Sequence, residues 1–107
     1  MQELKDFKAI KCVILGGERI KILHTYNNFK HYNSFKNDIS EYKIYVNSLN
    51  DDNTYYINLN RNSRYNLSRY LKALEKESID ISKIITYIVQ VRKSGYVFSY
   101  GEDIVMI

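Results

Sequence analysis

Residues 42–60 constrain the fold of this chain more than any other stretch. Apolar and polar side chains alternate through 42-YKIYVNSL-49 and again through 54-TYYINLN-60, and the sequence NDDN separates the two runs. Alternation with a period of two is typical of a strand that buries one face, and Asn and Asp are common in the turns that join strands. This stretch therefore predicts a β-hairpin.

The predicted hairpin has an apolar face and a polar face. A hairpin centred on the NDDN loop places Leu49 opposite Thr54. Asn47 then lies opposite Tyr56, and the aliphatic side chains share one face. The opposite face carries Lys43, Tyr45, Asn47, Tyr56, Asn58 and Asn60.

One helix is predicted, over about residues 64–77. Leucines recur at i, i+4 and i+7 from Leu67, and Tyr70 extends the same stripe. Either Asn62 or Ser63 can cap the N-terminus of this helix. We expect the stripe to pack on a sheet.

The N-terminal part of the chain is also β-rich. Residues 7–15 predict a strand, followed by a turn at Gly16 and Gly17 and a second β run over 18–26. The alternative is one long bent strand over 7–24.

A second hairpin is predicted from residues 84–92 and 96–100, with a turn at Lys93-Ser94-Gly95. Its first face carries Val89, Val91 and Val97, and its second face carries Gln90, Arg92, Tyr96, Phe98 and Tyr100. The run 104–107 could form a closing strand.

We expect residues 1–107 to form a single domain, mainly β with one helix (α+β). With 7–24 counted as one strand, three strands precede the helix and two follow it. This order resembles the OB fold, a five-stranded antiparallel barrel whose members place a helix between strands three and four. The resemblance implies an OB-like barrel or a strongly curved sheet.

The second half of the chain also resembles small phage-type single-stranded DNA-binding proteins. In that family a strand ending in Asn leads into a short helix and a terminal hairpin with a central Gly. The segment that often carries a Trp-Ile/Thr-Gly-Lys sequence in that family is ESIDISKI in this chain. The positions that match the layout are Asn60, Leu67, Leu71, Tyr87, Val91 and Gly95.

Basic and aromatic residues occur together in three places: 26-YNNFKHYNSFK-36 and one face of each predicted hairpin. An aromatic residue stands at every third position of the first segment, and a step of three does not hold one helical face. We therefore expect an extended loop there, with Phe29 and Phe35 in the core. The candidate contact residues are Tyr26, Lys30, His31, Tyr32, Lys36, Lys43, Tyr45, Tyr56, Arg92, Tyr96, Phe98 and Tyr100.

These residue types suit single-stranded nucleic acid, because bases stack on aromatic rings while Lys and Arg hold the phosphates. The formal net charge of +4 has the sign that such binding needs. Tyr also favours strands and cross-strand pairs that touch no ligand. The sequence predicts a non-catalytic single-stranded DNA- or RNA-binding protein, such as a phage or mobile-element accessory factor.

A protein partner is the alternative, because tyrosine-rich surfaces also form protein interfaces. The chain would then be a small phage-encoded inhibitor of a bacterial defence system, similar to an anti-CRISPR, that acts on a host nuclease or ribonucleoprotein complex. Its terminal strands could also pair between subunits of a homo-oligomer.

Little in the sequence suggests catalysis. The two histidines, His24 and His31, have no nearby carboxylate, and Gly16-Gly17 lacks the Lys-Ser/Thr of a phosphate loop. Cys12, the one cysteine, lies in an apolar run that predicts a buried side chain. We expect no enzymatic activity, no cofactor and no metal. No run has the length of a signal peptide or a transmembrane helix, so we expect a cytoplasmic protein without a membrane partner.

Overall fold

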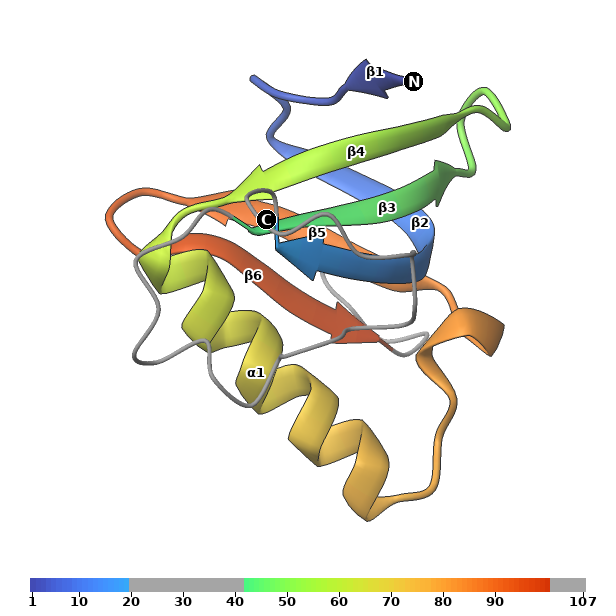
Figure 1. Cartoon of the computed structure of the whole chain (residues 1–107), viewed down its shortest axis with the longest axis vertical. Helices are drawn as coiled ribbons and strands as arrows, with labels where there is room; N and C mark the ends of the chain where they lie inside the picture. The colour runs from blue at the N-terminus through green and yellow to red at the C-terminus, as the bar shows by residue number, and fades with distance from the viewer. Residues whose placement is uncertain (20–41, 101–107) are drawn as a thin grey trace.

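The structure, a computed structural model, describes residues 1–19 and 42–100 (Figure 1). These residues form a mainly β protein with one α-helix, which confirms the predicted α+β class. The elements are β1 (Gln2–Glu3), β2 (Ala9–Arg19), β3 (Tyr42–Ser48), β4 (Thr54–Leu59), α1 (Arg61–Lys76), the short 3₁₀ helix η2 (Ile81–Lys83), β5 (Thr86–Val91) and β6 (Gly95–Tyr100).

The strands of the described residues form one mixed sheet in the order β1-β4-β3-β2-β5-β6. β1 is parallel to β4, and every other neighbouring pair is antiparallel. The sheet is not closed, since β1 and β6 lie at opposite edges. It thus differs from the predicted five-stranded antiparallel barrel in its open edges and in the additional strand β1. The predicted closing strand at 104–107 lies outside the described residues.

β2 runs without a break through Gly16 and Gly17, so the turn predicted there is wrong. One long strand is confirmed as far as Arg19, and its predicted continuation over 20–26 lies outside the described residues. The register against β3 shifts next to Gly16, which marks a β-bulge. Glycine at position 17 permits close packing, because a Cβ there would lie 2.7 Å from Tyr42 Cε1.

β3 and β4 form the predicted hairpin, and buried side chains alternate with partly exposed ones along all of β3. The predicted register is wrong, because Thr54 pairs with Asn47 and not with Leu49. Leu49 belongs to the turn, where its backbone N–H donates to the Lys11 carbonyl oxygen at 3.1 Å. The register moves by two residues, and an even shift keeps every side chain on its predicted face.

α1 begins earlier than predicted, at Arg61. Its N-cap is Asn60, whose side-chain oxygen accepts a hydrogen bond from the Ser63 backbone N–H at 2.9 Å. The predicted caps, Asn62 and Ser63, are therefore wrong. Asn60 alone separates the end of β4 from the first residue of the helix, so the strand fixes where the helix starts.

One face of α1 packs on the sheet, as its stripe of apolar residues predicted. Leu67, Tyr70 and Leu74 are buried against apolar side chains of the strands. The Tyr70 hydroxyl lies 2.9 Å from Thr86 Oγ1 on β5, so both buried polar groups have a partner. In Figure 1, α1 starts beside the connection between β5 and β6.

β5 and β6 form the second predicted hairpin, joined by residues 92–94. Its side chains group by face as predicted, but the face with Phe98 is the buried one. Phe98 is 7% exposed, pairs with Ile88, and stacks on Tyr70 with 6.0 Å between ring centroids. The prediction of Phe98 as a contact residue is therefore wrong. Both faces of this hairpin carry apolar side chains, so alternation alone does not identify the inner one.

Candidate nucleic-acid interface

The face of the sheet opposite α1 is called the outer sheet face below. Its side chains alternate with the buried residues of the four central strands. The two helices of the described residues, α1 and η2, contribute their apolar residues to the core on the other side. The outer sheet face carries Lys11, Val13, Leu15, Lys43, Tyr45, Asn47, Tyr56, Asn58, Tyr87 and Val89.

Three predicted contact residues form a cluster on the outer sheet face. Tyr45 and Tyr56 pair directly across β3 and β4. Lys43 Nζ lies 5.4 Å from the centre of the Tyr45 ring and 5.1 Å from the centre of the Tyr56 ring. Both distances are within the range of a cation–π interaction. The fold therefore brings one ammonium group and two aromatic rings into a single group.

A second basic and aromatic pair, Lys11 and Tyr87, lies on the same face. The two residues are opposite each other in the pairing of β2 with β5, and Lys11 Nζ is 5.1 Å from the centre of the Tyr87 ring. Neither residue was predicted as a contact residue. Each lies on a strand predicted from the sequence, but the pairing of two segments so far apart in the chain has no local signal.

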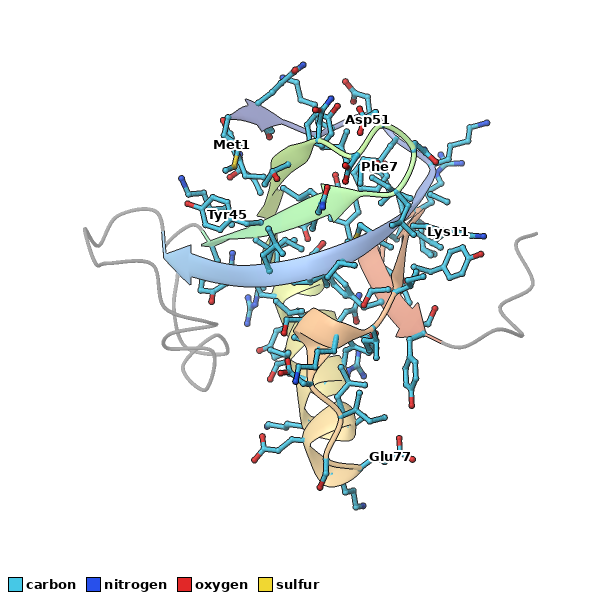
Figure 2. The ribbon with its side chains drawn as sticks, turned by 90° about the vertical axis from the view of Figure 1, so that its right-hand side faces the viewer. Met1, Phe7, Lys11, Tyr45, Asp51 and Glu77 are labelled. Carbon is cyan, nitrogen blue, oxygen red and sulfur yellow. The ribbon has the colours of Figure 1, made fainter. Side chains whose placement is uncertain are left out.

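The two groups lie near opposite ends of β2. Tyr45 is opposite Gly16, and Lys11 lies five residues earlier on the same strand, which corresponds to about 16 Å along β2. Val13 and Leu15 lie between the two groups on the outer sheet face. Figure 2 shows Tyr45 at one side of the molecule and Lys11 at the other. The face is long enough to contact more than one nucleotide.

A shallow apolar hollow lies beside Tyr45. It is lined by Met1, Leu15, Tyr45 and Thr54 and has a volume of about 350 Å³. Met1 and Tyr45 lie on the same side of the molecule in Figure 2. Met1 and Leu15 are both exposed in spite of their apolar side chains. A flat or apolar group of a ligand could therefore lie next to the Tyr45 ring.

The other predicted contact residues of the second hairpin do not join the outer sheet face. The Tyr96 ring is half-buried and stacks on Phe7, with 5.2 Å between ring centroids and an interplanar angle of 6°. Tyr100 is 38% exposed and pairs with the buried Thr86 at the other end of β6. Arg92 is exposed in the connection between the strands. The single aromatic surface predicted for this hairpin is therefore not formed.

The segment 26–36 lies outside the described residues. Its predicted contact residues stay predictions, as do the core positions expected for Phe29 and Phe35. The contact residues concerned are Tyr26, Lys30, His31, Tyr32 and Lys36.

Cys12 is a buried core residue, as predicted. Its burial raises the pKa of the thiol to about 12, so the thiol is protonated at neutral pH and is not a nucleophile. Among residues 1–19 and 42–100, no group of three His, Cys, Asp or Glu side chains is placed to hold a metal ion. No helix in this part of the chain has the length and apolar character needed to cross a membrane.

Comparisons with protein-family models, curated proteins and solved structures each gave no match, so the resemblances to the OB fold and to phage-type single-stranded DNA-binding proteins remain predictions.

Proposed function

We propose that the protein binds single-stranded nucleic acid without catalysis and that binding occurs on the outer sheet face. The observation that carries this proposal is the position of the Lys43 ammonium over the rings of Tyr45 and Tyr56. Aromatic rings stack on bases, and an ammonium group beside them can donate to a phosphate. One cluster thus combines the two interactions that a single strand requires.

The strand would run from this cluster toward Lys11 and Tyr87, where the same combination occurs again. Every base has a flat aromatic face, so stacking tolerates different sequences. We therefore expect weak sequence preference and strong dependence on salt, because phosphate contacts release bound counterions.

The proposal includes an OB-like origin for the sheet. Without β1 the strand order is β4-β3-β2-β5-β6, and a barrel would form from it if β4 paired with β6. β1 instead occupies the free edge of β4, and the Leu4 backbone N–H donates to the Tyr56 carbonyl oxygen at 2.8 Å. α1 contacts both β4 and β6. These observations support a barrel opened between those two strands.

A titration of fluorescently labelled oligo-dT, followed by polarisation at two salt concentrations, tests the proposed function. We expect saturable binding at low salt and a steep loss of affinity at high salt. A duplex of the same length serves as the control, because its stacked bases are not available to the tyrosines. If oligo-dT does not bind even at low salt, the proposed function is wrong.

A protein partner is the second candidate, and the apolar hollow beside Tyr45 favours it. An apolar side chain of a partner would fill that hollow, and the neighbouring tyrosines would supply contact area. Capture experiments with and without nuclease distinguish the candidates. A defined protein that stays bound after nuclease treatment, combined with no binding of oligo-dT, would favour the second candidate over the first.

A further inference from the structure

A separate pocket of about 520 Å³ lies between α1, over Asn62 to Lys72, and the connection between β5 and β6. Figure 1 shows the start of α1 beside that connection. The described residues that line the pocket are Asn62, Tyr65, Asn66, Ser68, Arg69, Lys72, Lys93 and Ser94. None of them belongs to the outer sheet face.

The lining combines cations from two distant parts of the sequence. Arg69 and Lys72 come from α1, and Lys93 comes from the connection between the strands. The described lining residues include no Asp or Glu. Three positive charges without a balancing carboxylate in the same wall create a local positive potential.

Amide groups of the helix bind carbonyl oxygens of the connection and of the beginning of β6. Asn62 Nδ2 donates to the Lys93 carbonyl oxygen at 2.9 Å. Asn66 Nδ2 donates to the carbonyl oxygens of Ser94 and Tyr96, at 2.8 and 2.9 Å. These bonds fix the position of the pocket wall, and they engage oxygens whose partial negative charge would otherwise repel an anion.

The guanidinium of Arg69 and the backbone of Lys93 are held by asparagine side chains of α1. Arg69 Nη2 donates to Asn66 Oδ1 at 2.7 Å, which orients the guanidinium while leaving its other N–H groups for a ligand. The bond from Asn62 fixes the Lys93 backbone, whose φ of +74° is one that residues other than glycine rarely adopt.

We propose that this pocket binds phosphate groups. Its guanidinium and two ammonium groups match the charge of an oligophosphate or of adjacent phosphodiesters, and Arg provides the forked donors that suit phosphate oxygens. The pocket and the outer sheet face share no residue, so this site does not depend on the proposed function. Two sources have the required chemistry, namely a free oligophosphate and a nucleic-acid backbone.

Calorimetric titration with inorganic tripolyphosphate, against sodium sulfate at matched ionic strength, tests the site. We expect saturable binding of tripolyphosphate that Lys72→Gln weakens about tenfold, because a charge-assisted hydrogen bond is lost. Lys76→Gln is the matched control, since Lys76 is exposed on the same helix, one turn farther from the connection, and does not line the pocket. Equal weakening by the two variants, or no saturable binding, would overturn the proposal.

Repeating the comparison with labelled oligo-dT distinguishes the two sources. A loss of oligo-dT affinity in Lys72→Gln, with a smaller salt dependence than the parent, identifies the nucleic-acid backbone as the ligand. Unchanged oligo-dT affinity, together with the loss of tripolyphosphate binding, identifies a free oligophosphate. If the parent protein binds tripolyphosphate but no oligo-dT, the proposed function is wrong and the phosphate site stands.

Discussion

Ser63 Oγ accepts a hydrogen bond from the backbone N–H of Tyr96 at 2.8 Å, which joins the first turn of α1 to the beginning of β6. Gly95 lies directly beside this bond. A Cβ at Gly95 would be 2.5 Å from Ser63 Oγ and 2.9 Å from Asn60 Oδ1. The helix cap and the connection between β5 and β6 therefore pack as one unit, and that unit carries the basic pocket.

Gly95→Ala is expected to lower the free energy of unfolding by about 2–4 kcal/mol. The native φ of +74° costs a residue with a Cβ about 1–2 kcal/mol, and the overlap with Ser63 adds a packing cost of similar size. Urea unfolding measures the loss. Ser63→Ala alone should cost about 1 kcal/mol, and the double variant should cost less than the sum of the two because the clashing hydroxyl is absent. Strict additivity would show that the two residues do not clash.

Tyr56→Thr is expected to weaken oligo-dT binding by about 1–3 kcal/mol, because a stacking ring is removed while the β propensity of the position is kept. The matched control is Tyr55→Thr. Tyr55 is the neighbouring residue on β4, and its side chain lies on the opposite face, where its hydroxyl bonds to the Asp51 carboxylate. Polarisation titrations at one salt concentration compare the two. Equal effects would place the bound strand somewhere other than the outer sheet face.

Lys93→Gly is expected to change stability and anion binding in opposite directions. Glycine adopts the φ of +74° without strain, so the free energy of unfolding should rise by up to about 1 kcal/mol. The same change removes a cation from the pocket, so tripolyphosphate should bind more weakly. Thermal unfolding and calorimetry measure the two effects. Unchanged tripolyphosphate affinity in a stabilised variant would exclude Lys93 from the site.

Stability is expected to fall at alkaline pH. Burial raises the pKa of Cys12 from 9.0 to about 12 and that of Tyr70 from 10.0 to about 12. Both groups are neutral when protonated, and burial disfavours their charged forms. The unfolded state therefore loses these protons at a lower pH than the folded state does. Their contribution is complete below pH 9 and is lost as the pH rises toward 12, with a slope of up to about 1.4 kcal/mol per pH unit for each group.

Urea unfolding between pH 7 and pH 11 measures this slope. Tyr70→Phe should flatten the part above pH 10, at a cost of about 1 kcal/mol at neutral pH from the lost bond to Thr86. Cys12→Ala should instead flatten the part that begins near pH 9. A decline above pH 10 that is the same in Tyr70→Phe and in the parent would exclude Tyr70 as its source.

Local sequence patterns predict the helix and strands of this fold better than they predict the register between strands, the buried face of a hairpin or the exact start of the helix. The first hairpin alternates clearly, so its faces were right, and the register error left them intact because it was an even number of residues. The second hairpin is apolar on both faces, so only the packing of Phe98 on Tyr70 reveals which side is buried. Asn60 ends the alternating run and is also a preferred N-cap residue, and three neighbouring positions (60, 62 and 63) offer cap residues. Only the bond from the Ser63 N–H identifies the one that caps the helix.

In the candidate site, too, residues that are neighbours on one hairpin are predictable from the sequence, and residues from distant segments are not. Lys43, Tyr45 and Tyr56 lie on one local hairpin, and the alternation within that hairpin predicts that all three share a face. Lys11 and Tyr87 were missed because their contact requires β2 to pair with β5. The basic pocket was missed for the same reason, since its cations come from two runs that only the tertiary fold brings together.

The central position of β2 has a consequence for how the chain folds. β2 is synthesised before β5, yet Ala9 pairs with Val89 on β5, so one edge of an apolar strand stays without its partner until β5 has left the ribosome. Pairing between such distant segments slows folding, and an open apolar strand edge can recruit other chains. Chains truncated before residue 86 should therefore aggregate rather than fold.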